Sequence, residues 1–85
     1  MRRVVISGHA RFQMERRQLS EETVRGVAMA PEQVVSSGEG RVVCQSRITD
    51  PVLGKQMLLR VVLREEQDAL VVLTAYKTSR IEKYW

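Results

Sequence analysis

One titratable ring and several arginines lie close together near the start of the chain. The segment from His9 to Ser20 reads HARFQMERRQLS, which places His9 near Arg16 and Arg17. Imidazole is the side chain whose ordinary pKa suits proton exchange near neutrality. A guanidinium group offers a planar pair of donors that fits phosphate oxygens. This combination is typical of proton transfer beside a phosphate group.

The chemistry that these residues suit is cleavage of RNA by its own 2′-hydroxyl. That reaction needs a base, cations for the charge on phosphorus and an acid for the leaving oxygen. The catalytic candidates are His9, Arg17, Arg60 and Lys83. Other residues are expected to bind the nucleic acid through charge or base stacking, namely Arg16, Arg41, Arg47, Arg64, Tyr76 and Tyr84. The reaction requires no metal and no cofactor.

Each candidate also has a structural interpretation. In that alternative His9 caps or hydrogen-bonds near a helix start, and Arg17 pins the helix to the sheet or to the C-terminal segment. Tyr76 then lies at the edge of the core, and Tyr84 and Trp85 pack on the apolar side of the first helix. Both interpretations remain open at the level of sequence.

The charge of the chain is concentrated at its two ends. The 85 residues carry a net charge of +4 and are expected to form a single domain, residues 1–85. Residues 1–17 hold five arginines against one glutamate, and residues 76–85 hold three cations against one glutamate. If the ends meet in space, they form one positive patch suited to RNA. The alternative is ordinary solvating charge.

The cysteine and histidine counts limit the classes of site. Cys44 has no second cysteine to pair with, which fits a reducing cytosol. One cysteine and one histidine cannot supply the four ligands of a zinc site. Cys44 lies in an apolar stretch and is expected to be a buried thiol. No apolar stretch approaches the length of a membrane span, so we expect no membrane association and a cytoplasmic protein.

Two helices are predicted in the N-terminal third of the chain. The segment Arg2–Ile6 is expected to be a short edge strand, and Ser7 to cap a helix that begins near Gly8 or His9. Ser20 is expected to cap a second helix, whose core face carries Val24, Val27 and Ala28 and which Pro31 ends.

After Pro31 the sequence alternates with period two. Strands are expected at 33–35, 41–49, 57–63 and 69–76. The polar side of these strands would carry Arg41, Gln45, Arg47, Arg60, Arg64 and Tyr76. The arginines would then line a cationic trough, or else solvate an exposed sheet face. The expected fold is α+β, with two N-terminal helices packed on a three- to four-stranded antiparallel sheet.

Short motifs along most of the chain resemble a known family. The opening HA..QM..R.LS from His9 to Ser20, followed by Val24 and PE.V from Pro31 to Val34, resembles the bacterial domain-of-unknown-function family 4258. The ending VLTAYKTS from Val72, followed by KYW from Lys83, resembles that family too. Gln13 stands where the family often has arginine. The family is remotely similar in layout to RelE- and BrnT-like toxins, which implies RNA cleavage and an antitoxin partner.

Three functions follow as hypotheses. The first is a toxin-like domain of a toxin–antitoxin system, acting as a metal-independent endoribonuclease on RNA and held by an acidic antitoxin. The second is a non-catalytic module that binds nucleic acid or an acidic protein. The third is a structural protein that self-associates through an exposed edge strand or the apolar tail.

Overall fold

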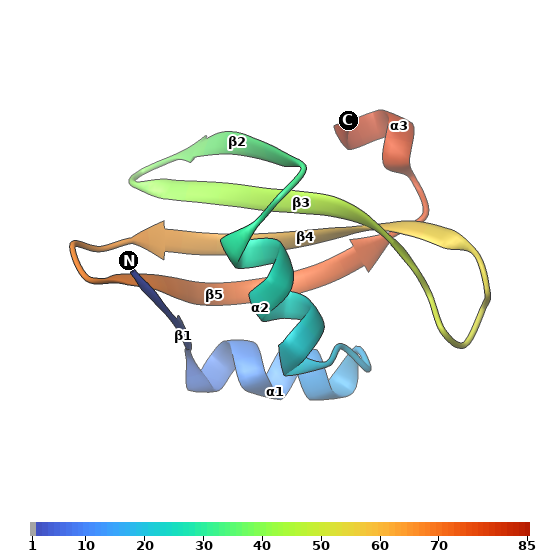
Figure 1. Ribbon diagram of the computed structural model, residues 1–85, viewed down its shortest axis with the longest axis horizontal. Helices are drawn as coiled ribbons and strands as arrows, with labels where there is room; N and C mark the ends of the chain where they lie inside the picture. The colour runs from blue at the N-terminus through green and yellow to red at the C-terminus, as the bar shows by residue number, and fades with distance from the viewer. Residues whose placement is uncertain (1) are drawn as a thin grey trace.

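A computed structural model describes residues 2–85 (Figure 1). Five strands and three short helices follow one another along the chain. In order these are β1 (Arg3–Ile6), α1 (Gly8–Arg16), α2 (Glu21–Met29), β2 (Gln33–Gly38), β3 (Arg41–Thr49), β4 (Gln56–Glu65), β5 (Ala69–Thr78) and α3 (Ile81–Tyr84).

All five strands belong to one mixed sheet. The order is β1-β5-β4-β3-β2, in which β1 runs parallel to β5 and the other neighbouring pairs are antiparallel. The expected three- to four-stranded antiparallel sheet is therefore wrong in strand number and in strand direction. The reason is that Arg3–Ile6 joins the sheet as a fifth strand beside β5 and runs parallel to it. These two strands are far apart in the chain, so no hairpin imposes an antiparallel direction on them.

The two N-terminal helices begin at the serines that the sequence indicates. Ser7 Oγ accepts a 3.1 Å hydrogen bond from the Ala10 amide, and Ser20 Oγ accepts one of 3.1 Å from the Thr23 amide. Each bond satisfies an amide that the first helical turn leaves without a backbone partner. α2 ends at Met29, two residues before Pro31.

The two helices do not cover one face together, which is a second difference from the expected fold. α2 crosses the sheet over β3 and β4, and its Val24, Val27 and Ala28 enter the core. α1 lies along β5 beyond the end of β1 and contributes Ala10 and Met14 (Figure 1). The sheet side of this core comes mainly from alternate residues of its strands, among them Cys44, Leu59, Val61, Leu63 and Val72.

Arginines from the helical segment cover the β1/β5 side of the sheet. Arg25 donates a 2.6 Å hydrogen bond to the Val4 carbonyl, and Arg17 donates one of 2.8 Å to the Ala75 carbonyl. Both carbonyls belong to strands at the β1 edge of the sheet, where a side-chain donor can replace a missing strand neighbour. They fix α1 and α2 relative to the sheet.

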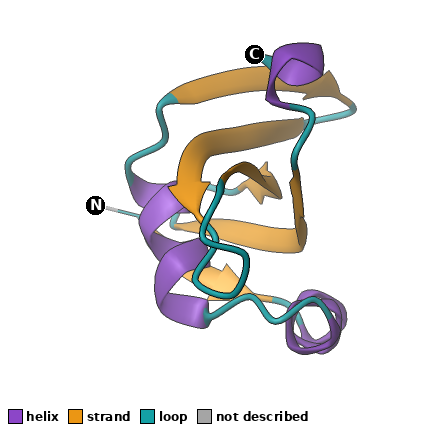
Figure 2. Ribbon diagram, turned by 90° about the vertical axis from the view of Figure 1, so that its right-hand side faces the viewer, coloured by secondary structure: helices purple, strands orange, loops and turns teal. Residues whose placement is uncertain are grey.

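The short helix α3 was not expected from the sequence. Figures 1 and 2 place it on the opposite side of the molecule from α1, at the β2/β3 side of the sheet. Four residues are too few for a pattern of apolar periodicity to reveal. Within residues 2–85, no helix has both the length and the apolar character that crossing a membrane requires.

Candidate nucleic-acid interface

The face of the sheet turned away from the core carries the polar residues that the alternation predicts. The register sets Gln45 opposite Arg60 and Arg60 opposite Tyr76, so these three side chains form a row across β3, β4 and β5. Arg41 and Arg64 are opposite each other farther along the same two strands. We call this surface the second face.

Arg60 is held at the centre of the second face by neutral groups. Its Nε donates a 2.9 Å hydrogen bond to Gln45 Oε1, and its Nη1 donates one of 2.5 Å to the Tyr76 hydroxyl. Its Cζ lies 4.1 Å from the centroid of the Tyr84 ring and 5.8 Å from that of Tyr76. No carboxylate within residues 2–85 forms an ion pair with Arg60. Its charge is thus oriented and stacked without being neutralised.

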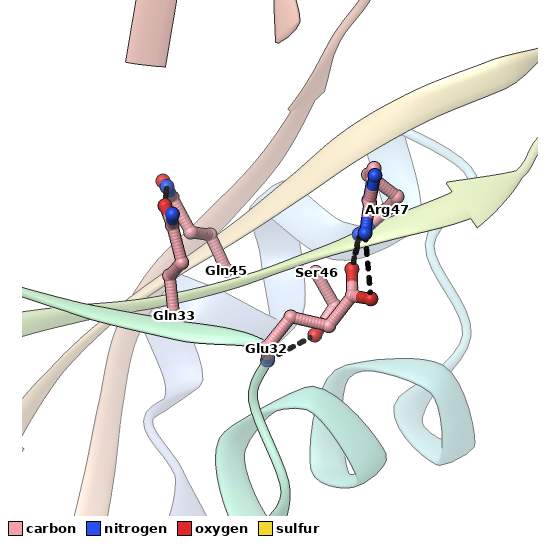
Figure 3. Close-up of polar contacts among 5 residues, drawn as sticks. All are labelled: Glu32, Gln33, Gln45, Ser46 and Arg47. Carbon is pink, nitrogen blue, oxygen red and sulfur yellow. Dashed lines mark hydrogen bonds and ion pairs between the residues drawn. The ribbon is translucent and has the colours of Figure 1, made fainter. Parts of the chain in front are cut away.

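Gln45 connects Arg60 to the C-terminal helix. This side chain is fully buried, and its Nε2 donates hydrogen bonds of 2.6 Å to Gln33 Oε1 and 3.0 Å to the Tyr84 carbonyl. Figure 3 shows Gln33 and Gln45 side by side, extending from neighbouring strands to the same side of the sheet. The buried amide therefore fixes both the arginine and the ring stacked on it.

Arg47 lies on the same face and is partly neutralised. Its Nε and Nη2 donate hydrogen bonds of 3.3 Å each to the two Glu32 carboxylate oxygens, as the dashed lines in Figure 3 indicate. These side-chain bonds, together with one from the Arg47 amide, lower the pKa of Glu32. The Arg47 Cζ also lies 4.5 Å from the Trp85 ring centroid. The Arg47 guanidinium thus forms an ion pair with Glu32 and also stacks on the Trp85 indole ring.

Two further predicted binding residues and the catalytic candidate Lys83 differ in how far their charge is available. Arg64 forms a 2.8 Å ion pair with Glu66, while Arg41 forms no ion pair with any residue in 2–85. Lys83 is exposed, with its Nζ 5.3 Å from the Tyr84 ring centroid. The second face therefore carries two arginines free of carboxylates, two paired arginines and an exposed lysine near the tail.

The tail packs differently from the structural alternative considered for it. Tyr84 and Trp85 contact Arg60 and Arg47 rather than the apolar side of α1. α3 accordingly lies over the β2/β3 side of the sheet (Figure 1). The aromatic tail and the strand arginines form one site.

His9, Arg16 and Arg17 do not join this cluster. All three are exposed on α1 or at its end, and α1 and α3 lie on opposite sides of the molecule (Figures 1 and 2). The two basic ends therefore do not meet around His9. Even within α1, His9 and Arg16 are about 10 Å apart along the axis, since each residue advances about 1.5 Å.

Arg17 has the pinning role that one interpretation assigned to it. Its Nη1 donates hydrogen bonds of 2.8 Å to the Ala75 carbonyl, 3.3 Å to Thr74 Oγ1 and 3.4 Å to Gln13 Oε1. Gln13 Oε1 also accepts a hydrogen bond from Thr74 Oγ1. Gln13 thus takes part in joining α1 to β5.

The sequence placed Gln45 on the polar strand face but did not predict its role in holding Arg60. Gln33, which accepts from Gln45, was not predicted, and neither was the ion pair of Lys77 with buried Asp50 near the end of α1. The signal for Gln45 was present, because a polar amide interrupts an otherwise apolar strand pattern. No comparable signal marks Lys77 and Asp50, which are far apart in sequence.

Cys44 is buried, as expected. Burial raises the pKa of its thiol, and the nearby charge of Glu65 raises it further. The neutral thiol is therefore favoured, which suits packing rather than nucleophilic attack. Within residues 2–85, no group of three or more histidines, cysteines and carboxylates is placed to hold a metal ion.

The second face can bind an anion and stack planar rings beside it. Arg60 offers a half-buried charge whose Nη2 makes no hydrogen bond to residues 2–85, and Tyr84 and Trp85 offer rings near the strand arginines. Phosphates with adjoining bases have this combination of charge and planar apolar surface.

Comparison with known proteins identifies a family for the chain but no individual protein that matches it. Neither a search of curated proteins nor a search of solved structures found a match. A family model described as a domain of unknown function (DUF4258) matches residues 6–77. The matched range includes α1 and the strand residues of the second face, whereas Lys83, Tyr84 and Trp85 lie beyond it. Because the match covers most of the chain, the protein belongs to the DUF4258 family.

Proposed function

We propose that the protein binds single-stranded RNA on the second face, with Arg60 as the central phosphate contact. The observation that carries this proposal is that Arg60 is fixed by two neutral partners and stacked on Tyr84, with no carboxylate beside it. A charge that is oriented and not neutralised favours an external anion. Single-stranded RNA brings phosphates together with bases that stack on aromatic rings and guanidinium planes.

The neighbouring residues divide the work of binding. Trp85 is 43% exposed and lies over Arg47, where a base can stack against its outer side. Lys83 and Arg41 contribute charge at two ends of the face. Gln45 touches no ligand in this proposal and positions Arg60 and Tyr84 from below.

A second candidate activity is metal-independent cleavage of the bound RNA. The observation that favours it is the Tyr76 hydroxyl, which is 2.5 Å from Arg60 Nη1 and so lies beside the proposed phosphate site. The 2′-oxygen would attack phosphorus while the bond to the 5′-oxygen breaks, leaving a 2′,3′-cyclic phosphate and a 5′-hydroxyl. A water molecule would take the proton of the 2′-hydroxyl, and the Tyr76 hydroxyl would give its proton to the departing 5′-oxygen and regain one from water. Arg60 would stabilise the charge on phosphorus. His9 is too remote from this face for that role.

These activities correspond to a toxin-like function in the bacterial cytoplasm. The support is the net charge of +4 and the arginines gathered on the second face. An acidic antitoxin would cover the same arginines and compete with RNA. The proposal therefore predicts mutual exclusion between the two partners.

Binding can be tested with a labelled single-stranded RNA and two variants of equal charge. In Arg60→Gln we expect at least a tenfold loss of affinity, measured by fluorescence anisotropy. Arg11→Gln removes the same charge from the far side of α1, where Arg11 pairs with Glu21, and should bind within about twofold of the parent protein. Equal losses in the two variants would reduce the interaction to net charge and contradict a site at Arg60.

Cleavage and toxicity are tested on the same proteins. Incubation of RNA in chelator should yield 2′,3′-cyclic phosphate ends, and Tyr76→Phe should slow the reaction by about 100-fold or more. Induction of the parent protein should arrest growth more than induction of Arg60→Gln at equal protein level. Intact RNA and normal growth would reject the toxin-like function and leave the binding module.

A further inference from the structure

The end of α1 carries a second cationic region that the proposed RNA site does not use. Two adjacent hollows of about 260 and 240 Å³ share Arg16 and Arg17 as lining residues. The larger hollow also includes Lys77 from β5 and the loop residues Val52 and Leu53. In Figure 1 this loop, between β3 and β4, bends toward the end of α1.

Arg17 is oriented in a way that leaves one edge of its guanidinium unused. All three of its hydrogen bonds leave from Nη1, toward Gln13, Thr74 and the Ala75 carbonyl. Its Nε and Nη2 make no hydrogen bond to residues 2–85. This pair of parallel donors is the geometry that grips two oxygens of a phosphate or carboxylate at once. The bonds through Nη1 hold the group in place before any ligand arrives.

The other charges at the hollow favour an anion. Arg16 forms no ion pair with residues 2–85 and lies over the Phe12 ring, 5.6 Å from its centroid. The one carboxylate among the lining residues, Asp50, is already bound by Lys77 and by the amides of Val52 and Leu53.

Carbonyls at the C-terminal end of α1 are also hydrogen-bonded. Three of the last ones accept from the amides of Arg17, Gln18 and Leu19. These bonds satisfy the carbonyl oxygens, whereas the helix dipole itself still disfavours an anion and must be outweighed by the nearby cations. Two unpaired guanidinium groups remain as the dominant charge.

The rim of the hollow adds an apolar surface next to these cations. Val52 is 76% exposed and Leu53 is 60% exposed, although both are large aliphatic residues. Asp50 Oδ1 holds their loop in place by accepting hydrogen bonds of 2.8 and 2.9 Å from their amides. A ligand with an anionic end and a planar apolar end matches the pair of surfaces. The volumes suit a small molecule better than an extended strand.

We propose that this region is a mononucleotide site, in which Arg16 and Arg17 bind the phosphate and Val52 and Leu53 support the base. The site lies at the end of α1, away from the second face, so it is independent of the proposed RNA site. Lys77 would contribute charge while remaining paired with Asp50.

The test is a titration of the isotope-labelled protein with adenosine 5′-monophosphate, followed by amide chemical shifts. We expect saturable shifts at residues 16–18, 50–53 and 77. Inorganic phosphate should shift residues 16–18 more weakly, and adenosine should bind at least tenfold more weakly than the nucleotide. Absence of saturable shifts at 16–18 with the nucleotide, or equal affinity for adenosine, would overturn the proposal.

Conservative variants separate the site from simple attraction of charge. Arg17→Lys retains the charge but loses the paired donors, and should weaken nucleotide binding by about tenfold. Arg11→Lys on the same helix is the matched control and should have no effect, since Arg11 pairs with Glu21. Unchanged affinity in Arg17→Lys would contradict the proposal.

Two further variants keep the test decisive. Arg17 also joins α1 to β5, so folding of Arg17→Lys is checked by circular dichroism. If that variant unfolds, Arg16→Gln replaces it, because the Arg16 side chain makes no hydrogen bond to the rest of residues 2–85, and it should weaken binding severalfold. Arg60→Gln should leave nucleotide binding unchanged, so that failure of the RNA proposal and failure of this one are read separately.

Discussion

Arg60 Nε donates a 2.9 Å hydrogen bond to Gln45 Oε1, and Gln45 is fully buried beneath it. The exposed chemistry of the second face thus depends on an amide in the interior. The same amide donates to Gln33 and to the Tyr84 carbonyl. The single side chain of Gln45 therefore connects β2, Arg60 and α3.

Replacement of Gln45 by leucine should therefore destabilise the protein. The change keeps the volume but leaves Arg60 Nε, Gln33 and the Tyr84 carbonyl without a partner. We expect the free energy of unfolding to fall by about 1–3 kcal/mol. Urea unfolding measures the change, with exposed Gln56→Leu on β4 as the control. A loss no larger than that of the control would show that water replaces the amide.

Removal of the acid beside Arg47 should strengthen RNA binding. In Glu32→Gln the carboxylate no longer neutralises Arg47, whereas the amide oxygen can still accept from the Arg47 backbone amide, as Glu32 Oε1 does at 2.7 Å. The slope of log affinity against log salt should steepen by about 0.7 for one added phosphate contact. Glu22→Gln removes the same charge at an exposed position of α2 and is expected to leave the slope unchanged. An unchanged slope in Glu32→Gln would place Arg47 outside the interface.

Stability should depend on pH through Asp50. Its pKa is lowered from 3.8 to about 2, first by the hydrogen bond from Lys77 and then by the amide of Leu53. A lowered pKa in the folded state means that the stabilisation is complete above the unfolded pKa and disappears as pH falls through the folded value. The urea midpoint of the parent protein should thus drop between about pH 4 and pH 2. The Asp50→Asn variant should be less stable at neutral pH, and its urea midpoint should fall less between pH 4 and pH 2. If the midpoints of the two proteins fell in parallel with pH, the assignment to Asp50 would be contradicted.

Gly26 offers a stabilising change. It lies in the middle of α2, is exposed, and an added methyl group meets no atom within 4 Å. Gly26→Ala should raise the free energy of unfolding by about 0.5–1 kcal/mol, because alanine loses less backbone entropy in a helix. Gly40→Ala is the contrasting case, since Gly40 has a φ of +74° and alanine there should destabilise. Thermal unfolding of both variants gives the comparison.

Much of the strand pattern could be read from the sequence because side chains alternate with period two. Arg41, Gln45, Arg47 and Arg60 share a face as the alternation requires. The caps Ser7 and Ser20 were also evident, because the signal for a helix start is local.

The mixed sheet and the grouping of the site could not be read in this way. Whether Arg3–Ile6 pairs with β5 depends on a contact between opposite ends of the chain, which no local pattern encodes. The same holds for Tyr84, whose partner Arg60 is set by the path of α3. His9 was assigned to the site by its residue type and its spacing from Arg16 and Arg17, and the fold places it away from the second face.

The parallel pairing of β1 with β5 has a consequence for biosynthesis. β1 finds its place only beside β5, so this part of the sheet cannot form until residues 69–78 have left the ribosome. At about 5–20 residues per second, that delay is several seconds for this chain. During it, Val4 and Ile6 have no core to enter, which makes the amino-terminal segment a natural point for chaperones or for early misassembly.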